Sequence, residues 1–151
     1  MDAIRPVSAA ALGRYAALLC RLDPVDRRLR FGRVLDDEAI LDHVDGLARR
    51  GGLVIGAWHG LLLHGAAEIA RTGDGVEIAL AVAAEARGAG LGRALLEAAL
   101  ARVAGCAVIV TVLAENRAMR ALAASAGFVP VRLGPDMALR RPAEGPTTIA
   151  A

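Results

Sequence analysis

The sequence predicts an α/β domain of the α+β type, with a mixed, mainly antiparallel central sheet of six or seven strands flanked by about four helices. Three observations support this. The 151 residues fit one domain, and 56% of them are hydrophobic, far too many for a disordered chain. The spacing of apolar residues is helical near the N-terminus, then strand-like, then alternates between the two. That order predicts helices on both faces of a mixed sheet.

The N-terminal third predicts two helices. Residues 8–22 carry Ala, Leu and Tyr15 at helical spacing. Asp23 and Pro24 fit an N-cap and a first helical position, and we expect a short turn over residues 25–31. Acidic residues begin a second helix over residues 36–49.

The middle of the chain predicts three antiparallel strands. Apolar runs at residues 53–58 and 61–70 flank Gly60, which is typical of a hairpin. A turn at residues 73–75 leads to a third strand over residues 76–82.

The C-terminal part alternates helices and strands. Helices are expected over residues 91–104 and 116–126, each closed by a glycine. The other segments predict strands, at residues 106–113, 128–133 and 137–140. We expect a single domain over residues 1–141 and a flexible tail over residues 142–151.

Composition and charge exclude several function classes. The net charge of +2 and the scarcity of aromatic residues argue against a nucleic-acid partner. The longest uncharged apolar run, residues 104–114, is shorter than the roughly 18 residues of a membrane span. The N-terminus resembles no signal peptide, so we expect a cytoplasmic protein without a membrane partner.

The cysteines and histidines give little sign of a metal. Cys20 and Cys106 are far apart, and we expect two reduced thiols. His59 and His64 are five residues apart across the turn at Gly60, which leaves a metal site open there. Since no cysteine lies at metal-ligand spacing from them, we expect no metal.

The most informative segment is a glycine-rich loop between a predicted strand and a predicted helix. Its residues are Arg87-Gly88-Ala89-Gly90-Leu91-Gly92, followed by Arg93. Three glycines let the backbone turn tightly and approach a ligand closely. Their amides converge at the positive end of a helix, which suits a phosphate or diphosphate, and the two arginines add positive charge.

Three phosphate-binding patterns are possible in such a loop. A P-loop needs Gly-Lys-Ser or Gly-Lys-Thr at its end, which is missing. A dinucleotide fingerprint needs a third glycine where this chain has Arg93. The pattern Arg-x-x-Gly-x-Gly is filled by Arg87, Gly90 and Gly92. In isolation, a plain glycine-rich turn would explain that match equally well.

The match is not isolated, because Asn116, Leu122 and Gly127-Phe128 follow at suitable spacing. Together these features resemble the GNAT superfamily of N-acetyltransferases. The resemblance implies that loop 87–92 binds the pyrophosphate of acetyl-CoA and that Asn116 lies beside the CoA arm. It also implies that the preceding strand pairs with the pantetheine, here through Leu80, Ala81 and Val82.

The resemblance implies transfer of an acetyl group to a primary amine by direct attack in a ternary complex. The segment from Asp23 to Phe31, with the acids at residues 36–38, is similar to bacterial protein lysine acetyltransferase (Pat-like) domains. In these a glutamate on the strand before the loop is the candidate general base, which corresponds to Glu77, acting directly or through water. A strand N–H, such as that of Val82, would polarise the carbonyl. The acceptor, a protein lysine or a small-molecule amine, is not identified, and a homodimer is possible.

Three questions stay open at this stage. The family's usual tyrosine position is Ala123, so the general acid is unassigned. That absence keeps a non-catalytic acyl-CoA-binding sensor as an alternative, besides a protein that uses the loop to bind ATP. Glu68 either binds a cationic substrate or pairs with an arginine such as Arg71.

Overall fold

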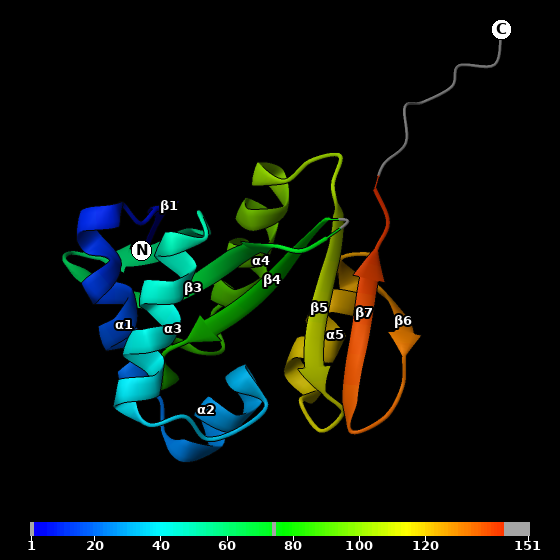
Figure 1. Cartoon of the computed structure of the whole chain (residues 1–151), viewed down its shortest axis with the longest axis horizontal. Helices are drawn as coiled ribbons and strands as arrows, with labels where there is room; N and C mark the ends of the chain where they lie inside the picture. The colour runs from blue at the N-terminus through cyan, green and yellow to red at the C-terminus, as the bar shows by residue number, and fades with distance from the viewer. Residues whose placement is uncertain (1, 74, 144–151) are drawn as a thin grey trace, which may run out of the picture.

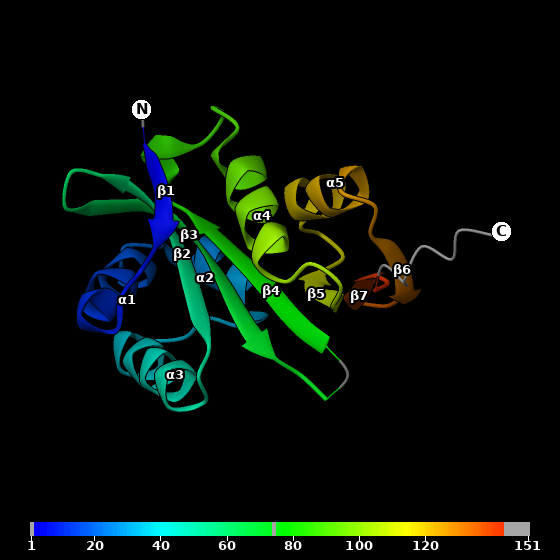
Figure 2. The ribbon, with the colours of Figure 1, turned by 90° about the horizontal axis from the view of Figure 1, so that it is seen from above.

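The computed structural model describes residues 2–73 and 75–143, which form one seven-stranded sheet with helices on both faces (Figures 1 and 2). The strands are β1 (Ala3–Pro6), β2 (Leu53–His59), β3 (Leu62–Arg71), β4 (Gly75–Val82), β5 (Ala107–Leu113), β6 (Val129–Arg132) and β7 (Asp136–Arg141). Their order in the sheet is β1-β2-β3-β4-β5-β7-β6, and only β4 and β5 are parallel. The predicted mixed, mainly antiparallel sheet is confirmed.

The described residues also form five α-helices and two short 3-10 helices. These are η1 (Ala9–Ala11), α1 (Leu12–Cys20), α2 (Pro24–Phe31), α3 (Asp37–Arg49), η2 (Ala84–Ala86), α4 (Leu91–Arg102) and α5 (Arg117–Ser125). The helix that follows the glycine-rich loop is α4, which carries the chain from β4 to the parallel strand β5.

Two elements differ from the sequence prediction. Strand β1 was not expected, because four residues ending at Pro6 are too short to show a period; β1 pairs antiparallel with β2 at the sheet edge. Residues 24–31 form helix α2 rather than a turn. This helix has no fully buried residue, so its ends define it instead of an apolar stripe: the Asp23 carboxylate accepts the Asp26 N–H, and Gly32 ends it at φ +79°.

Two cores hold the layers together, one on each face of the sheet. Helices α4 and α5 cover one face, and α1 and α3 cover the other (Figure 2). On β4, Ile78 belongs to the α4 core and Ala81 to the α1–α3 core, as the alternation of a strand requires. This alternation places Glu77 on the same face as Ala79 and Ala81.

The sheet is split between its two parallel strands. Strands β4 and β5 pair only at Gly75–Glu77 and residues 107–109, whereas β4 pairs with β3 as far as Val82 and β5 pairs with β7 along its length. Beyond Glu77 the two strands diverge, which is visible as a V in Figure 1. One edge of β4 therefore lacks a strand partner from Ile78 onward in the described part of the chain.

Two further expectations concern the whole chain. None of the helices in the described residues is long and apolar enough to cross a membrane. Of the predicted tail, residues 144–151 lie outside the described residues.

Candidate functional site

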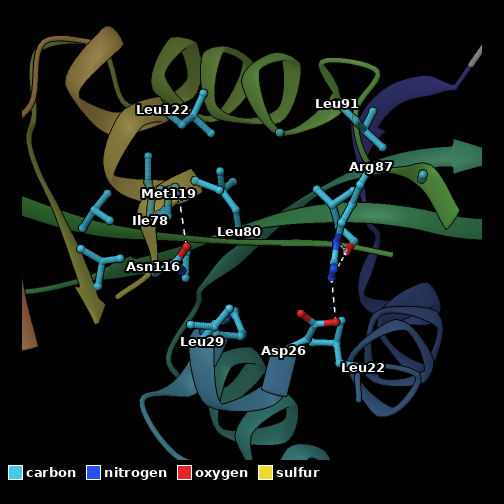
Figure 3. A pocket seen from close by; sticks show the side chains of 18 of the residues that line it. Leu22, Asp26, Leu29, Ile78, Leu80, Arg87, Leu91, Asn116, Met119 and Leu122 are labelled. Atoms are coloured by element: carbon cyan, nitrogen blue, oxygen red, sulfur yellow. Dashed lines mark hydrogen bonds and ion pairs between the residues drawn. The ribbon is translucent and has the colours of Figure 1, made fainter. Parts of the chain in front are cut away.

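The diverging strands enclose a cavity of about 380 Å³. It is bounded by β4 and β5, by α2 on one face of the sheet, and by the glycine-rich loop, α4 and α5 on the other (Figure 3). Most of the lining side chains are apolar: Leu22, Leu29, Ile78, Leu80, Val82, Leu91, Val110, Val112, Met119 and Leu122. Arg87 and the glycine-rich loop lie at one end, so the cavity suits an elongated ligand with an anionic head and a less polar arm.

The loop presents the N-terminus of α4 to this cavity. Gly88 and Gly90 both have φ +81°, a conformation that favours glycine, and Gly90 is the N-cap. A glycine N-cap has no side chain with which to satisfy the first amides of the helix, and the first turn of α4 contains no acidic residue. The amides of Leu91, Gly92 and Arg93 are therefore left for an anionic ligand, which a helix N-terminus favours.

The two arginines that flank the loop have different surroundings. Arg87 lines the cavity, where it donates to the Val82 carbonyl at 3.0 Å and pairs with Asp26 of α2 at 2.9 Å (Figure 3). Arg93 does not line it and reaches Ser125 of α5 at 3.4 Å. Of the pair, Arg87 is thus the one placed to meet a ligand, and Asp26 is a neighbour that the sequence did not point to.

The residues predicted to meet the CoA arm fall into two groups. Leu80, Val82 and Asn116 line the cavity together with the loop residues Gly88, Gly90, Leu91 and Gly92. Ala81 and Ala89 do not; the side chain of Ala81 is buried in the core beneath α1 and α3. Ala81 therefore offers no side chain to a ligand in the cavity, and its backbone groups face β3, as those of Ala83 do.

Asn116 has a structural role as well as a place in the cavity. Its side-chain oxygen accepts the Met119 N–H at 3.2 Å and caps α5 (Figure 3). This bond fixes the orientation of the side-chain amide and leaves its two N–H donors for other partners. Farther along the same helix, Ala123 is fully buried and brings no hydroxyl group to the site.

Glu77 lies at the vertex of the V, opposite Ala70 of β3 and Ile109 of β5, in the last residue pair before β4 and β5 separate. It is half-buried and does not itself line the cavity, although the next two residues of β4 do. Among the described residues it makes no hydrogen bond or ion pair, and its charge acts on Arg30 of α2. Its carboxylate is therefore not committed to a structural partner.

The sequence did not reveal a buried polar cluster beside the vertex. Glu68 of β3, which is 5% exposed, accepts a hydrogen bond from Tyr15 at 2.5 Å and pairs with Arg30 at 2.8 Å and with His43 at 2.8 Å. Its partner is thus Arg30, and the pairing with Arg71 considered from the sequence is wrong. An acid within an apolar strand was the only signal in the sequence, and it could not name partners that lie 25 to 53 residues away.

The cluster fixes the charges of Glu68 and Tyr15. Burial alone would raise the pKa of Glu68, but the hydrogen bond with His43 and the charge of Arg30 outweigh burial and lower this pKa to about 2. Burial raises the pKa of Tyr15 well above its usual value, so Tyr15 remains a neutral phenol. Glu68 is consequently a permanent anion that holds Arg30 against the cavity wall, and it is too weak a base to take a proton from an amine.

Comparison with known proteins agrees with this geometry. The model of the acetyltransferase (GNAT) family matches residues 19–128, well over half of the chain. No curated protein sequence matches the chain significantly.

Solved structures share the fold. The GNAT domain of S. lividans PAT is 20% identical with a TM-score of 0.76, and the match covers 93% of this chain and 89% of that one. A phosphinothricin acetyltransferase from Sinorhizobium meliloti, in complex with acetyl-CoA, is 19% identical with a TM-score of 0.71, over 97% and 94% of the two chains.

A ribosomal-protein-alanine N-acetyltransferase from Brucella melitensis is 24% identical with a TM-score of 0.67, over 92% of this chain and 98% of that one. At these identities the likenesses show the fold alone. The match to the family model is a match of sequence, and it covers the glycine-rich loop, both strands of the V and Asn116. The chain belongs to the GNAT family of acetyltransferases.

Proposed function

We propose that this protein moves the acetyl group of acetyl-CoA to a primary amine by direct attack in a ternary complex, with Glu77 as general base. The observation that carries the proposal is the cavity between β4 and β5. It joins the α4 N-terminus and Arg87 at one end to the part of β4 that follows Glu77. Pyrophosphate at the loop and an arm along β4 direct the thioester toward the vertex of the V.

The cavity walls suggest how acetyl-CoA is held. The amides of loop 87–92 and the guanidinium of Arg87 bind the pyrophosphate, and each hydrogen bond to the charged group contributes roughly 1.5–3 kcal/mol. The pantetheine pairs with the open edge of β4, as an added strand would, while Leu80, Val82 and Leu122 enclose it. A backbone N–H of β4 polarises the thioester carbonyl. The alternate residues Ile78, Leu80 and Val82 turn their backbone groups to the open edge, and we place this N–H at Ile78 or Leu80, because Val82 adjoins the loop that binds the opposite end of the arm.

The acid–base chemistry sets conditions on Glu77. An amine of pKa about 10.4 is neutral in only about one molecule in 2,500 at pH 7, and proton transfer to a carboxylate of pKa about 4.3 is uphill by roughly 8 kcal/mol. Glu77 therefore acts, directly or through water, on an amine whose own pKa falls as it leaves solvent for the half-buried vertex, which reduces this cost. Proton loss precedes attack, and the CoA thiol, of pKa about 8.5, leaves without needing a tyrosine.

Charges on the α2 face favour a cationic acceptor. Arg30 is neutralised by Glu68, and Asp26 is neutralised by Arg87. Glu77 is left as an acid without an ion-pair partner in the described part of the chain, so this face of the vertex is locally negative. An ammonium group would be attracted there before it is deprotonated.

The test begins with calorimetric titration of the purified protein with acetyl-CoA, with ATP and NAD as comparison ligands. We expect micromolar binding of acetyl-CoA alone. Release of CoA thiol is then followed with lysine peptides, peptide N-termini and polyamines, using Glu77→Gln and a matched control, Glu97→Gln, on the exposed side of α4.

Three outcomes separate the possibilities. Loss of turnover in Glu77→Gln by at least about 100-fold, with acetyl-CoA affinity retained, supports the assignment. Equal turnover in both variants and the unmodified chain removes Glu77 as the base but leaves the acetyltransferase intact. Absence of acetyl-CoA binding contradicts the whole proposal.

A further inference from the structure

Three possible metal ligands from different strands meet where β1, β2 and β3 lie side by side at one edge of the sheet. Asp2 precedes β1, His59 ends β2, and His64 lies in β3. Ala3 pairs with Trp58, so one more step along this register puts Asp2 opposite His59. None of the three lines the cavity between β4 and β5.

A β-bulge accounts for the position of His64. Trp58 pairs with Leu63 and Ala57 pairs with Gly65, which leaves His64 as an extra residue on β3. Leu63 belongs to the core under α1 and α3, and a side chain at Gly65 would meet Leu95 of α4. The bulge therefore turns His64 to the α4 face, where Asp2 and His59 also lie by the alternation of their strands.

The ligand atoms converge as a metal site requires. The Nδ1 of His59 lies 3.3 Å from Asp2 Oδ1, and the Nδ1 of His64 lies 3.3 Å from Asp2 Oδ2. The imidazole rings are stacked, with centroids 4.9 Å apart and planes 7° from parallel, so both rings direct Nδ1 toward one carboxylate. All three ligand atoms lie within 4.8 Å of one another.

Bond lengths show that one ion fits. With metal–ligand distances of about 2.0–2.2 Å, neighbouring ligand atoms around a tetrahedral ion lie roughly 3.3–3.5 Å apart. Each imidazole nitrogen already lies at that spacing from one of the two carboxylate oxygens, and 3.3 Å is long for a hydrogen bond between imidazole and carboxylate. The ligand atoms lie within 4.8 Å of one another, so closing the widest pair onto an ion needs a shift of at most about 1.5 Å, and His59, the most exposed ligand, can move.

We propose that Asp2, His59 and His64 bind one divalent first-row transition metal, such as Zn²⁺. Two neutral imidazoles and a carboxylate form an N₂O set that these ions prefer, and the Asp2 carboxylate offsets part of the charge of the cation. The side chains of Asp2 and His64 are 16% and 19% exposed and that of His59 is 64% exposed, so solvent reaches the ion and completes its coordination.

The ion would tie the N-terminal strand to the β2–β3 hairpin. It would also lie close to the glycine-rich loop, because the His64 carbonyl accepts the Ala83 N–H at 2.7 Å, just before η2 and that loop. The role is therefore structural: the metal stiffens the ends of β1, β2 and β3 that lie near the start of the loop. It takes no part in acetyl transfer and does not depend on the proposed chemistry at Glu77.

The test is calorimetry and thermal unfolding with ZnCl₂ and NiCl₂ on an untagged chain at pH 7.5. A Cys106→Ser background removes the exposed thiol as a competing ligand. We expect one ion per chain, a dissociation constant of about 10 μM or tighter, and a rise in Tm. His59→Ala and His64→Ala should each weaken binding at least tenfold, and so should Asp2→Asn. Asp45→Asn, on the exposed face of α3, should change nothing.

Other outcomes would overturn the proposal. It fails if no saturable binding occurs below 1 mM, or if affinity survives the loss of both histidines. His59→Ala is the decisive single variant, because the side chain is largely exposed and its loss leaves the fold intact. Co²⁺ absorbance gives a second readout, since nitrogen and oxygen coordination by these residues should disappear in that variant. Acetyl transfer is measured in parallel, so failure of the metal site and failure of the proposed function remain distinguishable.

Discussion

Replacement of Glu68 by Gln tests the electrostatics of the buried cluster beside the vertex. Glutamine has nearly the same shape as glutamate but no charge, so it leaves the Arg30 guanidinium, only 8% exposed, without its anion. It also weakens the hydrogen bonds that Tyr15 and His43 make to the carboxylate. We expect Glu68→Gln to destabilise the protein without altering its architecture.

The magnitude follows from the pKa of Glu68. A pKa of about 2 in the folded protein against 4.5 in the unfolded chain corresponds to about 3 kcal/mol of stabilisation at pH 7. Breaking a buried ion pair by removing one partner typically costs about 3–5 kcal/mol, which agrees. Because the folded pKa is the lower one, this stabilisation is complete above pH 4.5 and is lost as the pH falls toward 2. By pH 3.5 about 1 kcal/mol of it is gone.

The assay is urea denaturation of both proteins between pH 7 and pH 3.5. The difference in unfolding free energy should be about 3 kcal/mol at pH 7 and should shrink to about 2 kcal/mol at pH 3.5, because glutamine does not titrate. The control is Glu115→Gln, which removes a half-exposed ion pair with Arg28 and should cost less than about 1 kcal/mol. A difference below 1 kcal/mol at pH 7, or one independent of pH, would refute the reasoning.

Three further predictions concern the V and its ligand. A Cβ at Gly75 would lie 2.2 Å from a backbone carbonyl oxygen of β5, so Gly75→Ala should lower the unfolding free energy, measured in urea, by about 2 kcal/mol. The control is Gly73→Ala, which has open space around it and should change that free energy by less than about 0.5 kcal/mol. Equal effects would show that β4 and β5 have room to separate. Asp26→Asn releases Arg87 from a partly exposed ion pair worth up to about 1 kcal/mol, so calorimetry should show acetyl-CoA binding up to about fivefold more tightly. Weaker binding would contradict the idea that Asp26 and acetyl-CoA compete for the Arg87 guanidinium. Asn116→Ser keeps a cap for α5 but loses the side-chain amide, so the KM for acetyl-CoA should rise severalfold while the Tm stays unchanged. A fall in Tm without a change in KM would show that Asn116 has only a structural role.

Most of the fold could be predicted because its elements have periodic apolar patterns. The strands of the middle hairpin and the helix after the glycine-rich loop bury one regular face each, so their spacing in the sequence reveals them. Helix α2 was missed because its stability depends on Asp23, Gly32 and contacts along its length instead of an apolar stripe. Strand β1 was missed because four residues at an edge carry no period.

The site divides in the same way. The geometry of the loop end could be predicted because it is local: the glycines, Arg87 and the helix start are contiguous in the chain. The rest of the site is assembled from elements that are distant in the chain, so neither the partners of Glu68 nor the contact between Asp26 and Arg87 has a sequence signature. The meeting of His59 and His64 with Asp2 could not be predicted from the sequence either. It depends on a β-bulge in β3 and on the pairing of β1 with β2, which brings Asp2 beside the hairpin.

The contact between Arg87 and Asp26 links the two faces of the sheet at the loop end of the cavity. Arg87 belongs to the loop on the α4 face, whereas Asp26 belongs to α2, on the face from which an acceptor would reach Glu77. The guanidinium cannot keep its full ion pair with Asp26 while it binds a pyrophosphate, because its donors have fixed directions and two of its nitrogens already donate to the Val82 carbonyl. If acetyl-CoA binds as proposed, it would free Asp26 and so add a negative charge to the α2 side when the acetyl donor is in place. A cationic amine would then be attracted most strongly to the complex that can react with it.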